Sequence, residues 1–351
     1  MNQTKKTLIA GATGQIGSSV GEYLSKIGGW NPVGLARSPK LDATYPMLSV
    51  DLNSPERCRA QLGELADATH IVYAARFDHF GGELESKDTN VNMLRNLLDA
   101  IQPVARHLQH IHLVHGTKYY GHTIAERRTP YREDDACGNF NSFYFEQQQL
   151  LQQRQVGQSW NWSISRPHAF CNYRTDESRN LILVIGVYAS ILREMGLPLM
   201  FPGTPRNYEV KTQFSWLPTL ARSVAWMMES PQCANQAYNV VNGDPMSWSE
   251  LWPLFAQYFK MDLGKPNSDT FASFASDKTQ LWKQMTQRYG LQDTDLQTLA
   301  QWPYGDYVLS LNWDVVSDMS KAVRDGFVER VDTPKMWLGG FDYFRTQKII
   351  P

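Results

Sequence analysis

The 351-residue sequence is poor in cysteine and has almost no net charge. Its four cysteines (Cys58, Cys137, Cys171 and Cys233) are scattered and form no CxxC pair, so we expect reduced, buried, small hydrophobic side chains. Lysine and arginine total 34 against 35 aspartates and glutamates, a formal charge of −1. This balance lacks the electrostatic footprint of a nucleic-acid-binding protein, and we expect no nucleic-acid partner.

Long apolar runs are also absent. The longest, at 181–192, is too short to span a bilayer. The N-terminus has two lysines and only a short apolar stretch before the first glycines, unlike a signal peptide. The sequence therefore predicts a soluble, cytoplasmic protein without a membrane partner.

The first 170 residues alternate short β-branched runs with amphipathic stretches. Strands are expected at 7–12, 32–37, 46–51, 70–75, 110–116 and 162–166. Helices are expected at 16–27, 55–65, 91–104 and 143–155. Such alternation predicts an α/β fold, a Rossmann-type doubly wound parallel sheet covered by helices on both faces.

Beyond Pro167 the alternation loosens into helical patterns at 180–195, 218–228, 249–259 and 276–289. Eight of the eleven tryptophans follow residue 210, which favours a second core over an aromatic wall around an apolar substrate. We predict an NADP-binding Rossmann domain at 1–172 and a smaller, mainly helical substrate-binding lobe at 173–351. Residues from about 214 to 245 are expected to return to the Rossmann core.

A glycine-rich turn separates the first expected strand from the first expected helix. Glycines at GxxGxxG spacing permit a tight turn and let backbone amides approach a pyrophosphate at a helix N-terminus. This spacing is the one that short-chain dehydrogenases use, and with its flanking strand and helix it predicts dinucleotide binding. The expected contacts are Gly11, Thr13, Gly14, Gln15, Ile16 and Gly17.

The end of the second expected strand distinguishes NAD from NADP. An NAD site needs an acidic residue there for the ribose 2′-hydroxyl, but residues 23–41 contain no carboxylate. Arg37 can instead bind a 2′-phosphate bidentately, with Ser38 as a further donor. The cofactor is therefore predicted to be NADP(H). Asp51 and Leu52, which end the third strand, are expected near the adenine amine.

Two further segments carry chemistry. A standard short-chain dehydrogenase has Tyr and Lys four residues apart on one helix, where the lysine lowers the tyrosine pKa and the tyrosine donates a proton. Here Tyr144 is followed by Gln148 at that spacing, and Lys118 follows the fifth strand instead. We expect Lys118 to point into the cleft that holds Tyr144.

These motifs resemble those of the progesterone 5β-reductase/iridoid synthase-like (PRISE) family, an atypical branch of the extended short-chain dehydrogenases/reductases. The resemblance extends over essentially the whole chain. It is carried by GATGQIG at 11–17, GLARSP at 34–39, GTKYYG at 116–121, SFYFEQ at 142–147, RPHAF at 166–170, and segments 237–252, 309–327 and 348–351.

The resemblance implies NADPH-dependent 1,4-reduction of an enone or enal, with hydride added to the β-carbon. Tyr144 would hold the enolate oxygen, Lys118 would orient the tyrosine or the nicotinamide ribose, and solvent would protonate the α-carbon. The positions that match cofactor contacts are Thr13, Gly14, Gln15, Arg37, Ser38, Asp51, Leu52, Phe170 and Ser178, to which we add Ala75.

The substrate side departs from the family pattern. Family members commonly have a cavity tryptophan after the fourth strand, where this chain has Arg76 or Phe77. His115 and His168 replace a small polar residue and a glycine. The expected substrate contacts are Arg76, Phe77, Tyr119 and Trp337.

Other functions are weighed against this one. His110 and His112 share a strand face but have no cysteine or carboxylate at ligand spacing, so no metal is expected. Two alternatives are an NAD(P)-dependent carbonyl reductase and a sugar-nucleotide epimerase or dehydratase. Arg37 and the missing Tyr-x-x-x-Lys pair argue against the NAD-dependent epimerase. A non-catalytic NADP-sensing regulator would not need both Lys118 and Tyr144. A homodimer is left open.

Overall fold

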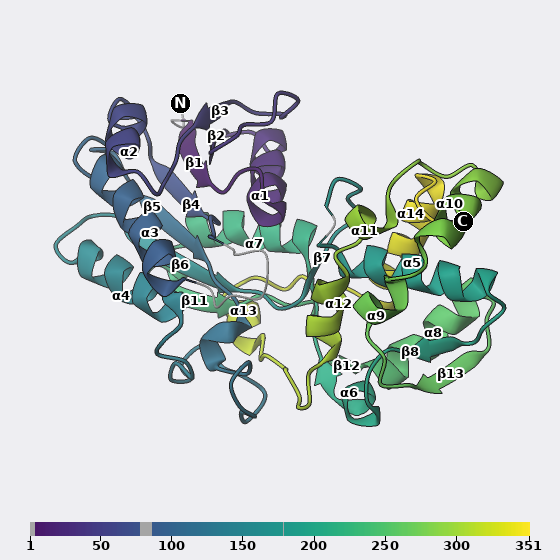
Figure 1. The fold of residues 1–351 in the computed structure, drawn as a ribbon. Helices are drawn as coiled ribbons and strands as arrows, with labels where there is room; N and C mark the ends of the chain where they lie inside the picture. The colour runs from purple at the N-terminus through teal and green to yellow at the C-terminus, as the bar shows by residue number, and fades with distance from the viewer. Residues whose placement is uncertain (1–3, 78–85, 178) are drawn as a thin grey trace.

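The computed structural model describes residues 4–77, 86–177 and 179–351, which form two lobes (Figure 1). The larger lobe contains a seven-stranded parallel sheet in the order β11-β6-β5-β4-β1-β2-β3. Its strands are β1 (Lys5–Ala10), β2 (Trp30–Ala36), β3 (Met47–Ser49), β4 (His70–Tyr73), β5 (His110–Val114), β6 (Asn161–Arg166) and β11 (Gln236–Asn239).

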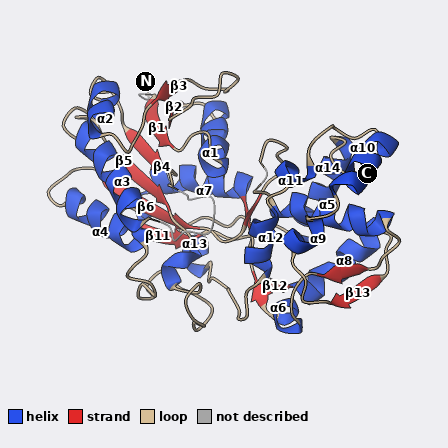
Figure 2. Ribbon diagram, viewed as in Figure 1, coloured by secondary structure: helices blue, strands red, loops and turns tan. Residues whose placement is uncertain are grey.

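Helices cover both faces of this sheet (Figure 2). Successive strand residues point to opposite faces, and Leu8 and Ile9 of β1 accordingly belong to two different buried clusters. One cluster includes α2 (Pro55–Leu62), α3 (Lys87–Ile101) and α4 (Phe143–Gln155). The other includes α1 (Gln15–Lys26) and α7 (Leu217–Glu229). The predicted doubly wound Rossmann fold is therefore confirmed.

The smaller lobe is mainly helical. Its central helix, α5 (Leu181–Glu194), is apolar on nearly all sides and is buried from residue 181 to 192, as expected for a helix with no polar face. Beyond α4, the other α-helices of the described residues are α6 (Pro205–Glu209), α8 (Trp248–Phe259), α9 (Phe271–Ala275), α10 (Thr279–Tyr289), α11 (Leu296–Leu299), α12 (Trp302–Leu309), α13 (Ser320–Arg324) and α14 (Thr333–Thr346). Two short 3₁₀ helices are η1 (Thr117–Tyr120), which precedes α4, and η2 (Pro231–Cys233).

Three two-stranded sheets complete the fold. They pair β7 (Phe170–Cys171) with β10 (Ser215–Trp216), β9 (Lys211–Thr212) with β12 (Met246–Ser247), and β8 (Leu199–Phe201) with β13 (Leu263–Pro266). Through β10 the chain leaves the smaller lobe and returns to the large sheet, where α7 covers one face and β11 pairs with β6. β11 is a strand that the hydrophobic pattern did not predict. The division near residue 172 remains our proposal.

The cysteines and several tryptophans of the second half of the chain are buried, as expected. The four cysteines, all within the described residues, are buried and form no disulfide. The bulkiest core side chains of the smaller lobe include Trp248, Trp252, Trp282 and Trp337, each at most 2 % exposed. No helix among the described residues is long and apolar enough to cross a membrane.

Candidate active site

A cleft of about 440 Å³ lies at the carboxyl ends of the central strands, where segments of the smaller lobe also reach the sheet. The carboxyl edge of a parallel sheet is where such folds bind ligands. Thirteen of the predicted site residues line it: Gly11, Thr13, Gly14, Gln15, Ile16, Arg37, Asp51, Leu52, Ala75, Arg76, Phe77, Tyr144 and Phe170.

The glycine turn between β1 and α1 leaves room for a ligand backbone. Gly11 has φ +81°, and a β-carbon on it would lie 2.7 Å from both Ala74 O and Ala75 N, so only glycine fits this crossing. Gly14 is the N-cap of α1 and has no side-chain cap, and a β-carbon there would meet only Gly11 O, at 3.4 Å. The first turn of α1 can therefore receive a pyrophosphate. Gly17 packs behind the turn and does not line the cleft.

Gln15 connects this turn to the segment that follows β7. Its Nε2 donates to Arg179 O at 2.8 Å, and its Oε1 accepts from Asn172 Nδ2 at 2.7 Å. Asn180, the N-cap of α5, donates to Asn172 Oδ1 at 3.0 Å. These amides hold the glycine turn against the start of the smaller lobe.

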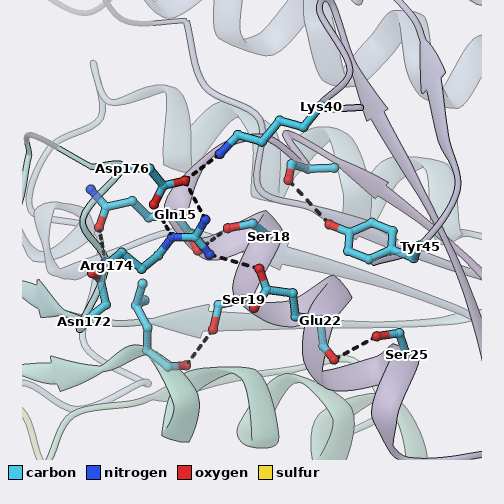
Figure 3. A network of polar contacts seen from close by, with 12 residues as sticks. Gln15, Ser18, Ser19, Glu22, Ser25, Lys40, Tyr45, Asn172, Arg174 and Asp176 are labelled. Carbon is cyan, nitrogen blue, oxygen red and sulfur yellow. Dashed lines mark hydrogen bonds and ion pairs between the residues drawn. The ribbon is translucent and has the colours of Figure 1, made fainter. Parts of the chain in front are cut away.

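An ion-pair cluster strengthens the same connection (Figure 3). Arg174 donates to Glu22 of α1 at 2.9 Å and to both oxygens of Asp176, and Lys40 donates to Asp176 at 2.8 Å. These bonds, chiefly those from Arg174, hold the pKa of Asp176 well below its ordinary value. The loop after β7 is thereby anchored to both α1 and the loop that follows β2.

Arg37 directly follows β2, is exposed, and lines the end of the cleft that also contains Asp51 and Leu52. Asp51 accepts a 3.0 Å hydrogen bond from Asn53 N, which fixes the turn after β3. Ser38 is exposed and does not line the cleft. Ser178 lies outside the described residues.

Tyr144 lies at the opposite end of the cleft. The N-cap Ser142 accepts a 3.2 Å hydrogen bond from Tyr144 N and starts α4 there. The tyrosine ring is 7 % exposed and packs between Phe143, with ring centroids 4.4 Å apart, and His115, at 4.6 Å. A β-carbon on Gly116 would lie 3.5 Å from the tyrosine oxygen, so the hydroxyl lies over the end of β5.

Lys118 lies two residues beyond Gly116, in η1, and is half-buried. Its ammonium is 5.3 Å from the ring centroid of Tyr307, on α12 of the smaller lobe. Lys118 itself does not line the cleft. Its charge therefore lies between the two lobes, close to the end of β5, over which the Tyr144 hydroxyl lies.

A second cation, which the sequence did not single out, lies beside Gln148, one helical turn after Tyr144. Arg166, at the end of β6, is 1 % exposed and stacks on Tyr119 with its guanidinium carbon 3.6 Å from the ring centroid. It donates to Gln148 Oε1 at 3.2 Å and to Tyr120 Oη at 2.9 Å. Tyr119 is thus buried beneath Arg166 and does not line the cleft, contrary to its predicted contact with substrate.

His115 packs against the Tyr144 ring as an uncharged side chain. Burial, aided by the nearby Arg166 cation, lowers its pKa to about 3, so the imidazole is neutral at neutral pH. A neutral ring can stack on Tyr144 without the cost of a buried charge.

The smaller lobe contributes residues that sequence reasoning missed. Glu177, Arg179 and Gln301 line the cleft, and Arg179 is 5.6 Å from the ring of Tyr304 on α12. No motif marks them, since Glu177 and Arg179 reach the cleft from the loop after β7 and Gln301 reaches it from the N-cap of α12. Trp337, a predicted substrate contact, is instead fully buried in the core of the smaller lobe. Its ring packs against Phe214, Trp248, Phe255 and Phe341.

The strand histidines have partners of their own. His110 Nε2 and His112 Nδ1 contact Ser163 Oγ at 2.7 and 2.8 Å, and His112 Nε2 contacts Ser165 Oγ at 3.0 Å. Across the described ranges, no group of three or more His, Cys, Asp or Glu side chains could hold a metal ion.

The chain is similar to known enzymes over nearly its whole length. The chain is 28 % identical to a 3-oxo-Delta(4,5)-steroid 5-beta-reductase of Arabidopsis thaliana, over 98 % of this chain and 92 % of the relative. It is 29 % identical to an (S)-8-oxocitronellyl enol synthase of Nepeta racemosa, over 100 % and 94 %. The structure of a Thermus thermophilus UDP-glucose 4-epimerase in complex with NAD has the same fold, with a TM-score of 0.68 and 16 % identity, over 97 % of this chain and 99 % of that one.

A family model described as a PRISE-like Rossmann-fold domain matches residues 50–351. This match confirms the resemblance seen in the motifs, and a Rossmann domain of this kind implies a nicotinamide cofactor. The chain belongs to the PRISE-like Rossmann-fold family.

Proposed function

We propose that this protein is an NADPH-dependent reductase that adds hydride to the β-carbon of an α,β-unsaturated ketone or aldehyde. The observation that carries the proposal is the Tyr144 hydroxyl, which lies over the end of β5 at one end of the cleft, with Gln148 rather than lysine four residues later. The names of the steroid reductase and the enol synthase support it, since both denote chemistry at an unsaturated carbonyl compound.

Bound NADPH would supply the hydride. The Tyr144 hydroxyl donates a hydrogen bond to the substrate carbonyl oxygen, where negative charge develops as the β-carbon gains hydride. An oxyanion-hole hydrogen bond of this kind is worth about 3 kcal/mol of barrier. A solvent proton then completes the saturated product at the α-carbon.

Tyr144 only has to hold the oxygen in this reaction, and it need not lose its proton. That requirement fits its surroundings, because Gln148 brings no charge and His115 is neutral. Lys118 and Arg166 lie farther out and keep the local potential positive, which favours an enolate.

The preference for NADPH over NADH is part of the proposal. Arg37 at the cleft edge can pair with a 2′-phosphate, and residues 23–41 offer no carboxylate to a free 2′-hydroxyl. The glycine turn and Gln15 would hold the pyrophosphate end.

An epimerase of sugar nucleotides is less well supported. In the standard pair a lysine four residues after the tyrosine lowers the tyrosine pKa, and Gln148 cannot do so. Likeness to the epimerase at 16 % identity concerns the fold alone. A carbonyl reductase or an NADP-sensing regulator has no observation of its own in its favour.

The test is to follow NADPH oxidation with a panel of enones, enals and saturated ketones, and to follow the conversion of UDP-sugars in the presence of NAD⁺ or NADP⁺ by chromatography. We expect turnover of enones or enals, with the saturated carbonyl compound as product. Turnover of saturated ketones or UDP-sugars with none of the enones or enals would overturn the proposal. NADPH binding without turnover of any class would indicate the regulator.

A further inference from the structure

Lys118 is carried by η1, a single 3₁₀ turn whose other side chains are buried. Thr117, Tyr119 and Tyr120 are buried, whereas Lys118 is half-buried. The Lys118 ammonium leaves the turn toward the smaller lobe, where it lies 5.3 Å from the ring centroid of Tyr307. Because the coulombic effect of a charge falls with distance, the way this turn is held decides how strongly the ammonium acts at the end of β5.

Thr117, the residue before Lys118, is held at three of its atoms. Its N donates to Pro167 O at 3.1 Å, and its O accepts from His122 Nδ1 at 3.0 Å. Its Oγ1 lies 2.6 Å from Nδ1 of His168, a hydrogen bond between two side chains. These three bonds constrain the backbone from which Lys118 extends.

His168 is itself anchored on two sides. Its N donates to Ser215 Oγ at 2.9 Å, and Ser215 Oγ donates to Val240 O at 2.6 Å. Its ring packs edge-on against that of His122, with ring centroids 5.3 Å apart. The imidazole that contacts Thr117 is therefore fixed both through its backbone and through its ring.

Packing alone does not account for an imidazole at His168. Burial, together with the neighbouring His122, holds the pKa of His168 well below its ordinary value, so the ring is neutral at neutral pH. Its Nε2 is buried and has no hydrogen-bond partner within the residues that the structure describes. Burying an unpaired polar nitrogen costs free energy that an apolar side chain would avoid. The bond from Nδ1 to Thr117 is the contact that an apolar side chain could not make.

We propose that His168 is a positioning residue for Lys118, on which it acts by holding the Thr117 hydroxyl and with it the turn that carries the lysine. Neither His168 nor Thr117 lines the cleft, so neither is assigned a contact with the substrate. The inference rests on the proposed ene-reduction, in which the Lys118 ammonium favours the enolate. A misplacement of about 1 Å that arises far from the chemistry can cost about 10²-fold in rate.

The experiment is a double-mutant cycle between His168 and Lys118. His168→Leu removes the ring nitrogens, and His168→Asn retains a polar atom at the position of Nδ1. Thr117→Val removes the partner hydroxyl and keeps the shape of the side chain. Each variant is made in the wild type and in Lys118→Met, with His107→Leu, at an exposed position, as the control. kcat is measured with the enone or enal of the panel that the wild type reduces fastest, and NADPH affinity is measured beside it.

We expect His168→Leu and Thr117→Val to lower kcat by about tenfold, and His168→Asn and His107→Leu to lower it by less than about threefold. In the Lys118→Met background, His168→Leu should cost less than about twofold, because no ammonium remains to be positioned. If His168→Leu does not fold, Thr117→Val completes the same cycle.

Three outcomes would overturn the inference while leaving ene-reduction intact. The first is an equal loss with and without Lys118, because His168 would then act on the fold alone. The second is an unchanged kcat in His168→Leu, or a His168→Asn protein as slow as His168→Leu. The third is a loss confined to NADPH affinity, which would place the role of His168 at the cofactor.

Lysine acylation keeps the inference testable if no enone or enal is reduced. The rate at which acetic anhydride modifies Lys118 is followed by mass spectrometry in wild type, His168→Leu and His168→Asn, with the exposed Lys283 of α10 as the internal reference. We expect His168→Leu to change the Lys118 rate by at least about threefold and His168→Asn to leave it near the wild-type value, because an amine reacts according to its access and its surroundings. That result would support the positioning role even though ene-reduction had failed. An unchanged Lys118 rate in His168→Leu would overturn it.

Discussion

Arg166 donates a 3.2 Å hydrogen bond to Gln148, the residue four positions after Tyr144. Gln148 occupies the sequence position of the usual lysine, and the cation beside it comes from the end of β6 instead. The guanidinium stacks on Tyr119 and donates to Tyr120, so these two neighbours fix its orientation. Positive charge is thereby kept near Tyr144 without a lysine on α4.

Restoring the usual lysine should therefore harm the protein. Gln148→Lys would place an ammonium beside the buried Arg166 and remove its acceptor, and we expect the free energy of unfolding to fall by more than about 1 kcal/mol. Urea unfolding measures this, with Gln153→Lys on the exposed side of α4 as a control. A Gln148→Lys protein as stable as the control would show that Arg166 tolerates a second cation.

Removing the Tyr144 hydroxyl should affect the chemical step. Tyr144→Phe is expected to lower kcat by about 10²- to 10³-fold and to leave NADPH affinity nearly unchanged, because the lost hydrogen bond forms to the developing enolate. Tyr289→Phe, which removes an exposed hydroxyl bonded to Glu194, is the matched control. Full activity in a folded Tyr144→Phe protein contradicts the mechanism.

Arg37 should discriminate between the two nicotinamide cofactors. Arg37→Ala is expected to weaken NADPH by at least tenfold and NADH by much less, since only NADPH carries the 2′-phosphate. Dissociation constants from fluorescence titration measure this, with Arg57→Ala on α2 as a control. Equal losses for both cofactors would mean that Arg37 does not bind the phosphate.

Buried histidines should make the protein sensitive to mild acid. Burial lowers the pKa of His70 to about 4 and that of His110 to about 3. The unfolded chain, with an ordinary histidine pKa near 6.5, then binds protons that the folded chain excludes. The free energy of unfolding is therefore highest above pH 6.5. It falls as the pH drops below 6.5, by about 1.4 kcal/mol per histidine at pH 5.5.

Urea unfolding at pH 7.5 and pH 5.5 measures this loss. His110→Gln removes one of these groups, so its free energy of unfolding should fall less between the two pH values than that of the wild type. His107→Gln, at an exposed position, should behave like the wild type. Identical pH dependence in wild type and His110→Gln would contradict the assignment.

The elements of the large sheet were predictable because hydrophobic periodicity and turn residues involve positions that are close together in the chain. Residues 143–155 were predicted as a helix and form α4 with those bounds. The glycine turn follows from backbone geometry alone, and Gly11 indeed has the positive φ that such a turn requires. The predicted strand ends were less accurate. Strands were expected to end at residues 75 and 116, but β4 ends at Tyr73 and β5 at Val114, because the direction of the chain there depends on the loops that follow.

The sequence by itself determined the Rossmann fold, the glycine turn and the missing carboxylate after β2. Only the tertiary structure decided that Arg166 bonds to Gln148, that Lys118 lies against α12, and that Trp337 belongs to the core of the smaller lobe. Periodicity and turn residues report on neighbours in the chain. Contacts such as Arg166 with Gln148, or Lys118 with Tyr307, join residues that only packing between helices, sheet and lobes brings together.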